Sequence, residues 1–203
     1  MIILDFGSGN TCKNDTAYIR RMIDALADVT TRRDMIIKWQ LFTEAGENIP
    51  LSHYCFQFAY QYAQAQGFKT TASVFDKASL DYLLTYDVPF VKLANNEKSH
   101  ALSVYIPRGI KIIRSYYQAI NRDAFSNSEH LCCISKYPAS ITDYLNHFST
   151  ISLHDGISDH TMNLYLYHQF EPYNYECHYK LEDSTGLDAG DFARTPEQLK
   201  EIL

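Results

Sequence analysis

The sequence lacks the cysteine patterns of two common small-protein designs. It has 5 cysteines, an odd number, with no CxxC pair and with Cys132-Cys133 adjacent inside an apolar run. A zinc knuckle needs closely spaced pairs, and a disulfide framework needs an even set. We therefore expect reduced thiols and a cytoplasmic protein.

Long apolar runs and an excess of basic residues are also missing. No run reaches the roughly 18 apolar residues that a membrane-spanning helix needs. The net charge is -6, from 18 Lys and Arg against 24 Asp and Glu, which argues against a nucleic-acid-binding surface. The chain enters Ile2-Ile3-Leu4-Asp5 directly, with no basic segment and apolar core of a signal peptide. We expect neither nucleic acid nor membrane as a partner.

The composition is that of one globular domain. The 203 residues are 46% hydrophobic and 21% charged, enough for one sizeable core and too few for two comfortable domains. There are 16 tyrosines, whose rings combine apolar area with a polar tip and suit pocket walls. No internal repeat or linker divides the chain, so we expect a single domain over 1–203.

Short strand-like runs alternate with stretches of helical spacing. The expected strands are 2–6, 35–39, 70–75, 89–94, 110–114, 129–135, 150–154 and 174–179. The expected helices are 15–27, 53–66, 79–84, 99–104, 116–121, 141–148, 161–168 and a last one opened by Thr195-Pro196-Glu197. Alternating strands and helices imply a parallel sheet, and eight units imply a closed (β/α)8 TIM barrel. An open doubly wound sheet with fewer strands is the alternative.

Polar residues gather where the expected strands end. In a barrel, these positions face one shared pocket. They are Asp5, Lys38, Gln40, Asp76, Lys92, Asn95, Ser115, Tyr137, His154, Ser158, Asp159, His160, Glu176 and His178. The densest group is 154–161, so we expect it to lie at the centre of the site.

Lys38 and Lys92 each interrupt an otherwise apolar strand. A buried lysine is costly unless it meets an opposite charge. Two lysines facing one pocket would bind an anion such as phosphate or carboxylate. The alternative is that each pairs with an internal Asp or Glu.

His160 and His178 are candidate metal ligands. Two histidines, with a carboxylate and waters, suit a divalent ion. Asp5 would complete that shell, act as a base, or pair with a barrel lysine. For His154 a structural role is favoured.

Several short segments, in chain order, match the signature of a known family. They are IKWQ at 37–40, SVFD at 73–76, VPFVKL at 88–93, CISKYP at 133–138, GISDHT at 156–161, ECHY at 176–179 and GLD at 186–188. They resemble V-K-F-Q, T-P-F-D, K-I-x-S, C-x-S-x-Y-P, G-x-S-D-H-T, E-K-H-F and G-P-D-H of the sialic acid synthase family. These are the N-acetylneuraminate synthases that condense phosphoenolpyruvate with a sugar, and their relatives.

The resemblance implies a barrel that adds phosphoenolpyruvate to the open-chain aldehyde of an N-acylated amino sugar. It implies a divalent ion, manganese or magnesium, on His160 and His178, which would polarise the aldehyde. It places the phosphate and carboxylate of phosphoenolpyruvate on Lys38, Lys92 and Ser158, with Asn95 and Ser115 at further substrate positions. The sugar would face Gln40, Tyr137 and Asp188. Asp5 stands where the family has a glutamate that orients or deprotonates water.

The chain also departs from the family. Gly9-Asn10-Thr11 lacks the histidine of N-H-N, Asn95 replaces a serine, and Ala189 replaces a histidine. Tyr116-Tyr117 replaces T-G and would place bulk where phosphate lies. We expect a barrel domain alone, without the family's antifreeze-like C-terminal domain, which in a homodimer brings an arginine to the sugar site. We therefore expect the metal-binding end of the pocket to match the family better than the sugar-binding end.

Three functions remain open from the sequence. The first is a metal-dependent enzyme that condenses phosphoenolpyruvate with an amino sugar or a smaller aldehyde, either alone or as a homodimer. The second is a catalytically degenerate barrel that serves in binding or assembly. The third is a metal-dependent aldolase or isomerase that does not use phosphoenolpyruvate.

Overall fold

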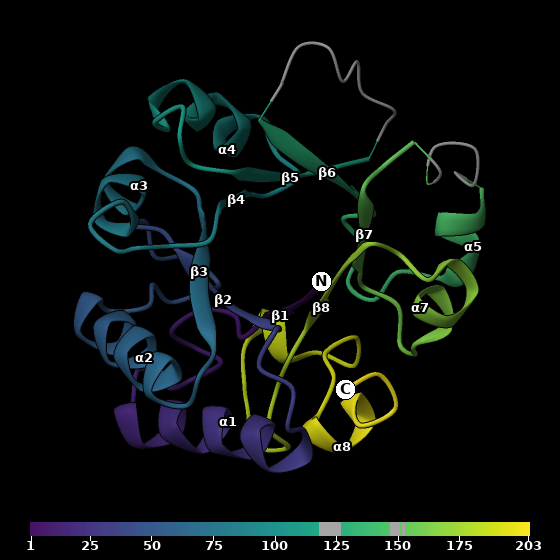
Figure 1. The fold of residues 1–203 in the computed structure, drawn as a ribbon, viewed down its shortest axis with the longest axis horizontal. Helices are drawn as coiled ribbons and strands as arrows, with labels where there is room; N and C mark the ends of the chain where they lie inside the picture. Colours follow the sequence, from purple (N-terminus) through teal and green to yellow (C-terminus); the bar gives the residue numbers. More distant parts are fainter. Residues whose placement is uncertain (118–126, 147–150, 152) are drawn as a thin grey trace.

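The eight strands form one closed parallel barrel in chain order. The computed structural model describes residues 1–117, 127–146, 151 and 153–203. Each strand pairs with the next, and β8 closes on β1 (Figure 1). The strands are β1 (Ile2–Asp5), β2 (Ile36–Leu41), β3 (Lys69–Val74), β4 (Val91–Leu93), β5 (Ile112–Tyr116), β6 (Ser128–Cys133), β7 (Gly156–Asp159) and β8 (Asn174–His178). The predicted TIM barrel is confirmed.

Helices surround the barrel on the outside (Figure 1). They are α1 (Thr16–Val29), α2 (His53–Ala65), α3 (Lys77–Leu83), α4 (Glu97–Ala101), α5 (Ile141–Leu145), α7 (Tyr165–Phe170) and α8 (Pro196–Leu199), with short 3-10 turns η1 (Leu102–Tyr105) and η3 (Leu187–Ala189). Local side chains fix where several begin. Asp15 caps α1 by accepting from the Ala17 amide, and Thr195 caps α8 with Pro196 in its first turn.

The barrel interior has an apolar floor beneath a polar layer. Ile3, Ile36, Phe90, Ile113 and Leu131 form a separate buried cluster inside it. Side chains two residues apart on a strand point the same way. The residues two positions after this cluster, toward the carboxyl ends of the strands, therefore also face the barrel interior, and they carry the polar groups that line the cavity. The charged side chains in that layer are therefore next to apolar side chains, a low-dielectric environment.

Strand register brings three titratable residues side by side. Asp5 at the end of β1 is opposite Lys38 of β2 on one side and opposite His178 of β8 on the other. Residues paired on neighbouring strands lie about 5 Å apart. Closure of the barrel between β8 and β1 thus joins the two ends of the chain into one site.

The strand expected at 150–154 is wrong at 151, 153 and 154, which are not in a strand, and 150 and 152 lie outside the described residues. Ile151 has helical conformation and is buried with Tyr144 and Ile157 in a satellite core, while the strand begins at Gly156. A side chain on Gly156 would lie 2.0 Å from the carbonyl oxygen of Asn174. Ile151 therefore packs beside the barrel, and the lack of a side chain at Gly156 is what allows β7 to approach β8.

Two helix predictions also need correction. Tyr116, expected to start a helix over 116–121, ends β5, and 118–121 lies outside the described residues. The helix expected at 161–168 begins at Tyr165, because Thr161 and Asn163 form a turn: the Thr161 hydroxyl donates to the Asn163 carbonyl. Of the helix expected over 141–148, the described part ends at Leu145.

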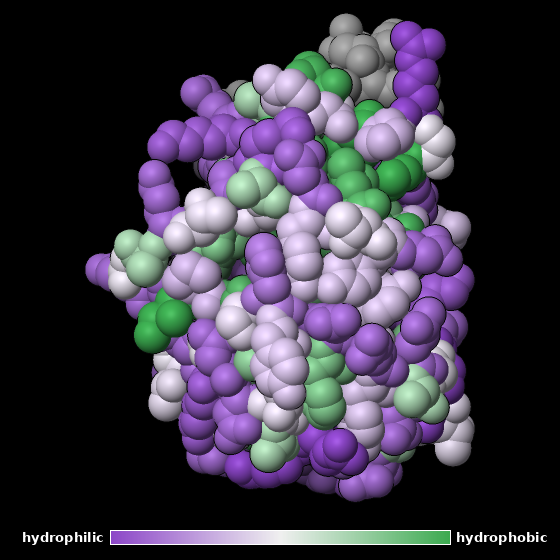
Figure 2. Space-filling view, turned by 90° about the vertical axis from the view of Figure 1, so that its left-hand side faces the viewer, coloured by the Kyte–Doolittle hydropathy of each residue, from purple (hydrophilic) through white to green (hydrophobic). Residues whose placement is uncertain are grey.

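The outer face over α2 and α3 is dominated by polar and aromatic residues. Figure 2 shows hydrophilic and intermediate residues over most of it, with hydrophobic residues in separate groups. His53 stacks on Tyr82 at 3.7 Å between ring centroids, and Tyr82 and Tyr86 share a hydrogen bond between hydroxyls. Among the described helices, none combines the length and apolar character needed to cross a membrane.

Candidate active site

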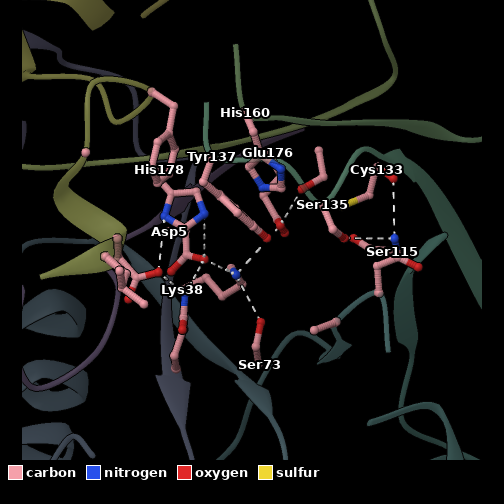
Figure 3. Close-up of a pocket in the computed structure, with 18 of the residues that line it drawn as sticks. Asp5, Lys38, Ser73, Ser115, Cys133, Ser135, Tyr137, His160, Glu176 and His178 are labelled. Carbon is pink, nitrogen blue, oxygen red and sulfur yellow. Dashed lines mark hydrogen bonds and ion pairs between the residues drawn. The ribbon is translucent and has the colours of Figure 1, made fainter. Parts of the chain in front are cut away.

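One cavity of about 530 Å³ collects all of the residues to which the sequence assigned a catalytic, substrate-binding or metal-binding role. The predicted residues in its wall are Asp5, Lys38, Gln40, Lys92, Asn95, Ser115, Tyr137, Ser158, His160, His178 and Asp188. They come from the carboxyl ends of the strands and the loops that follow, the end of a barrel where chemistry is usually found. Figure 3 shows several of them pointing toward one another.

Lys38 is held by an internal ion pair. Its Nζ lies 2.6 Å from Asp5 Oδ2 and 2.9 Å from Ser73 Oγ (Figure 3). Burial alone would lower the pKa of Lys38, but Asp5 and Glu176 outweigh it and raise the pKa. Burial would likewise raise the pKa of Asp5, yet Lys38 and His178 hold it well below its usual range. The internal pairing considered as an alternative is therefore present at Lys38.

Lys92 has a weaker set of partners. Its Nζ donates to Ser115 Oγ at 2.7 Å, and the Glu176 carboxylate is further away, at 3.4 Å. Burial lowers the pKa of Lys92, and Glu176 offsets this only in part. The two lysines thus differ in protonation tendency although both are fully buried.

Glu176 connects the two lysines, and the sequence assigned it no role. Its Oε1 accepts from Ser158 Oγ at 2.9 Å and lies 3.7 Å from Lys38 Nζ. Its Oε2 is buried without a hydrogen-bond partner. Burial favours the neutral acid, but the two lysines outweigh it and lower the pKa of Glu176. The sequence did offer one indication that Glu176 faces the cavity. Glu176 and His178 are two residues apart on β8, so their side chains must point to the same, inward face.

His160 and His178 face the cavity as neutral rings. His160 Nδ1 lies 2.7 Å from the Ile134 carbonyl oxygen, so this nitrogen carries the proton and Nε2 carries a lone pair. Burial lowers the pKa of His160 to about 4, with His178 adding to the effect. Burial also lowers the pKa of His178, which Asp5 opposes. The ring centroids are 5.4 Å apart.

The two imidazoles fit a divalent metal as part of its shell. Neutral histidine is the form that binds metal, and a carbonyl on the other ring nitrogen fixes the orientation. His178 Nδ1 is also buried without a hydrogen-bond partner. Within the described residues, no preformed group of three or more His, Cys, Asp or Glu is placed to hold an ion. The remaining ligands would have to come from water or substrate.

Gln40 bridges two carboxylates at the other side of His178. Its Nε2 donates to Asp5 Oδ2 at 3.0 Å and to Asp188 Oδ1 at 2.9 Å. Burial raises the pKa of Asp188 to about 6, and the charge of Asp5 adds to it. Asp188 can therefore exchange a proton near neutral pH, which Asp5 cannot.

Phe192 forms an aromatic wall that the sequence did not indicate. Its buried ring lies 4.9 Å from His178 and 5.2 Å from Tyr137, between centroids. Arg194 donates to the Phe192 carbonyl at 2.7 Å and to the Thr161 carbonyl at 2.7 Å, which ties this loop to the one after β7. A side chain on Gly190 would lie 2.7 Å from the Phe192 ring. Phe192 could not be predicted as a site residue, because it lies in a loop, where the sequence shows no periodic pattern of apolar and polar residues.

Other predicted features lie outside the cavity wall. Asp76 caps α3 through the Ser79 amide and accepts from the Thr43 amide. Tyr116 packs 4.2 Å from His100, and neither Tyr116 nor Tyr117 lines the cavity, so the bulk expected at the phosphate position is absent there. The replacement of T-G by Tyr116-Tyr117 therefore leaves the cavity open, because Tyr116 points out of the barrel.

His154 and Asp159, two titratable residues of 154–161, also do not line the cavity. His154 precedes β7 and does not line the cavity. Asp159 accepts from the Thr161 amide and from the Tyr175 hydroxyl, both at 2.7 Å, and so orients the loop after β7.

No protein-family model matches the chain, and no curated protein matches it. Solved structures do match. An N-acetylneuraminic acid (sialic acid) synthetase from Leptospira borgpetersenii serovar Hardjo-bovis has a TM-score of 0.77 and 20% identity, over 98% of this chain and 80% of that one.

Two spore coat polysaccharide biosynthesis proteins also match. The one from Bacillus subtilis has a TM-score of 0.73 and 20% identity, over 99% of this chain and 65% of that one. The one from Chromobacterium violaceum has a TM-score of 0.76 and 16% identity, over 98% and 71%. The chain has the barrel fold of these carbohydrate-biosynthesis proteins. The resemblance seen in the motifs is thus confirmed at the level of the fold.

Proposed function

We propose that the protein condenses phosphoenolpyruvate with the aldehyde of an N-acylated amino sugar or a related aldehyde, using a divalent metal. The observation that carries this proposal is the meeting of Lys38, Lys92, His160 and His178 in one cavity. Anion-binding amines beside two neutral imidazoles would serve a phosphorylated donor and a metal-bound carbonyl.

The donor end would be formed by Lys92, Lys38 and Ser158. Lys92 is the amine with the fewest internal charge contacts, so its ammonium form would be stabilised by an incoming phosphate or carboxylate. Lys38 would share its charge between that anion and Asp5. Asn95 and Ser115, both in the cavity wall, would supply further hydrogen bonds.

The acceptor end would be formed by His160, His178, Gln40, Asp188 and Tyr137. A bound manganese or magnesium ion would act there as a Lewis acid on the aldehyde oxygen. Asp188 would bind a sugar hydroxyl, with Gln40 fixing its orientation. Asp5, whose pKa is held low, would orient a water molecule through an accepted hydrogen bond rather than remove its proton.

A binding role without catalysis is the second candidate. It is favoured by the Lys38–Asp5 ion pair and by Glu176 between the lysines, because these carboxylates already neutralise the anion site. An aldolase or isomerase that does not use phosphoenolpyruvate remains the third.

We also propose a reducing, cytoplasmic setting and a homodimer. The five cysteines are free and buried, which suits a reducing compartment. Tyr137, Met162 and Leu187 expose more than half of their side chains in loops after β6, β7 and β8, where a second copy would cover them. Light scattering coupled to gel filtration would test the dimer.

Phosphate release from phosphoenolpyruvate tests the main proposal. The assay would contain manganese or magnesium and a panel of aldoses, with N-acylated amino sugars among them. We expect release that depends on metal and acceptor, and that Lys92→Met removes. Lys77→Met, at an exposed ion pair on α3, is the matched control. Metal binding with no release for any acceptor would favour the binding role.

A further inference from the structure

The two cavity lysines are chemically different. Lys38 Nζ is bonded directly to a carboxylate oxygen, at 2.6 Å, and to Ser73. Lys92 Nζ donates to one hydroxyl, Ser115 Oγ, and its nearest carboxylate oxygen is 3.4 Å away. A proton is therefore bound more firmly at Lys38 than at Lys92.

Burial makes the difference consequential. Lys92 lies above the apolar floor and is 2% exposed, so its ammonium form loses most of its hydration. Burial lowers the pKa of Lys92, whereas Lys38 has a raised pKa. A desolvated lysine amine that faces a cavity is the arrangement used by Schiff-base enzymes.

We propose that Lys92 forms a Schiff base with the carbonyl carbon of a 2-keto acid bound in this cavity. This covalent activity uses no metal and no phosphoenolpyruvate, and so goes beyond the proposed condensation. The substrate class follows from the surroundings. A 2-keto acid has a carboxylate for Lys38 and Ser158 to bind, next to the carbonyl that Lys92 attacks.

Glu176 is placed to carry the proton. Glu176, whose Oε1 lies 3.4 Å from Lys92 Nζ, first takes one proton from the Lys92 ammonium. The freed lone pair attacks the carbonyl carbon, a C–N bond forms, and Glu176 returns that proton to the carbonyl oxygen to give the carbinolamine. Glu176 then takes a second proton from the nitrogen and passes it to the carbinolamine hydroxyl. The C–O bond breaks, water leaves and the protonated imine remains, so two of the three ammonium protons leave in the water. The Oε2 of Glu176 is buried without a hydrogen-bond partner, so it is free to accept each of these protons.

Reductive trapping tests the assignment. The full chain, treated with chelator, would be incubated with pyruvate and sodium borohydride and mapped by peptide mass spectrometry. Mapping matters because burial also lowers the pKa of the Met1 amine, a competing site. We expect more adduct on Lys92 than on Lys38, because the Lys38 amine is held as an ammonium by Asp5 at 2.6 Å.

Variants and phosphate complete the test. Lys92→Arg should lose the cavity adduct, and Lys77→Arg should keep it. In the wild-type chain, adduct confined to Met1 and exposed lysines, with Lys92 unmodified, would overturn the proposal. Added inorganic phosphate should slow trapping if Lys92 also binds anions. Labelling of Lys92 that phosphate does not slow would support the Schiff base and contradict only anion binding there, so the two proposals can fail separately.

Discussion

The Nδ1 of His160 lies 2.7 Å from the carbonyl oxygen of Ile134, which turns Nε2 of the same ring toward the cavity. The β6 end thereby fixes the tautomer and direction of a ring carried by the loop after β7. His178 approaches from β8. Because the His160 ring is neutral and buried, it presents a lone pair rather than a proton to whatever enters the cavity, and burial favours the neutral form of His178 as well.

Replacing His160 should therefore abolish manganese binding. Hydrogen-bond partners of metal-bound histidines are already worth 10–100-fold in affinity, so loss of the ligand in His160→Gln should raise the dissociation constant by at least roughly 100-fold. Electron paramagnetic resonance of free manganese would measure it. His168→Gln, at an exposed pair with Glu201, is the control and should bind as the wild type does. Equal affinity in both variants would place the metal elsewhere.

Glu176→Gln should lower the free energy of unfolding and make the stability of the protein depend on added phosphate. The change leaves Lys38 and Lys92 without their shared buried charge, and breaking such a group costs about 3 kcal/mol of unfolding free energy. Urea denaturation would measure it. Added phosphate should recover part of the loss, because an anion bound only by the folded state stabilises it.

The matched control is Glu197→Gln, at an exposed ion pair on α8. It should change stability by less than about 0.5 kcal/mol and show no greater phosphate effect than the wild type. If phosphate does not rescue Glu176→Gln, the two lysines do not form an anion site.

Phe192 and Gly190 should behave as a coupled pair. Phe192→Ala removes a buried ring, at a cost of about 3–5 kcal/mol. Gly190→Ala alone should cost about 1–3 kcal/mol, because the added methyl lies 2.7 Å from that ring. In the double variant, the cost of Gly190→Ala should largely disappear, because the ring it clashes with has been removed. A double-mutant cycle of unfolding free energies would detect this. Simple addition of the two costs would contradict the observed placement of Phe192.

Gly156→Ala tests where β7 begins. The added methyl would lie 2.0 Å from the Asn174 carbonyl oxygen, a backbone atom that cannot move without opening the β7–β8 pairing. We expect a loss of about 3 kcal/mol or more, with a lowered melting temperature. Gly109→Ala, where no atom lies within 4 Å of the added carbon, should leave stability nearly unchanged. An unaffected Gly156→Ala variant would argue for a different strand.

Most of the barrel could be predicted because parallel strands buried on both sides are mainly apolar. Runs such as Ile2–Asp5 are recognisable in the sequence, as is the polar residue at the carboxyl end. Ile151 in the run at 150–154 misled for the same reason, since a residue that packs on the outside of the barrel is also apolar. Whether Gly156 ends or starts a strand depends on contact with Asn174, which is distant in sequence.

The site could be predicted in its residues but not in its pairings. Strand ends supplied Lys38, Lys92, His160 and His178. That Asp5 is bonded to Lys38 depends on the register between β1 and β2, and that Glu176 is shared between both lysines depends on the closure of the barrel between β8 and β1. Phe192 belongs to a loop whose position is set by Arg194, and no pattern in the sequence encodes that.

The most direct test of the account is a crystal structure with manganese and phosphoenolpyruvate. We predict manganese on the imidazoles of His160 and His178, and the phosphate or carboxylate of phosphoenolpyruvate within hydrogen-bonding distance of Lys92. Manganese bound away from both rings, or phosphoenolpyruvate bound outside the cavity at full occupancy, would contradict it.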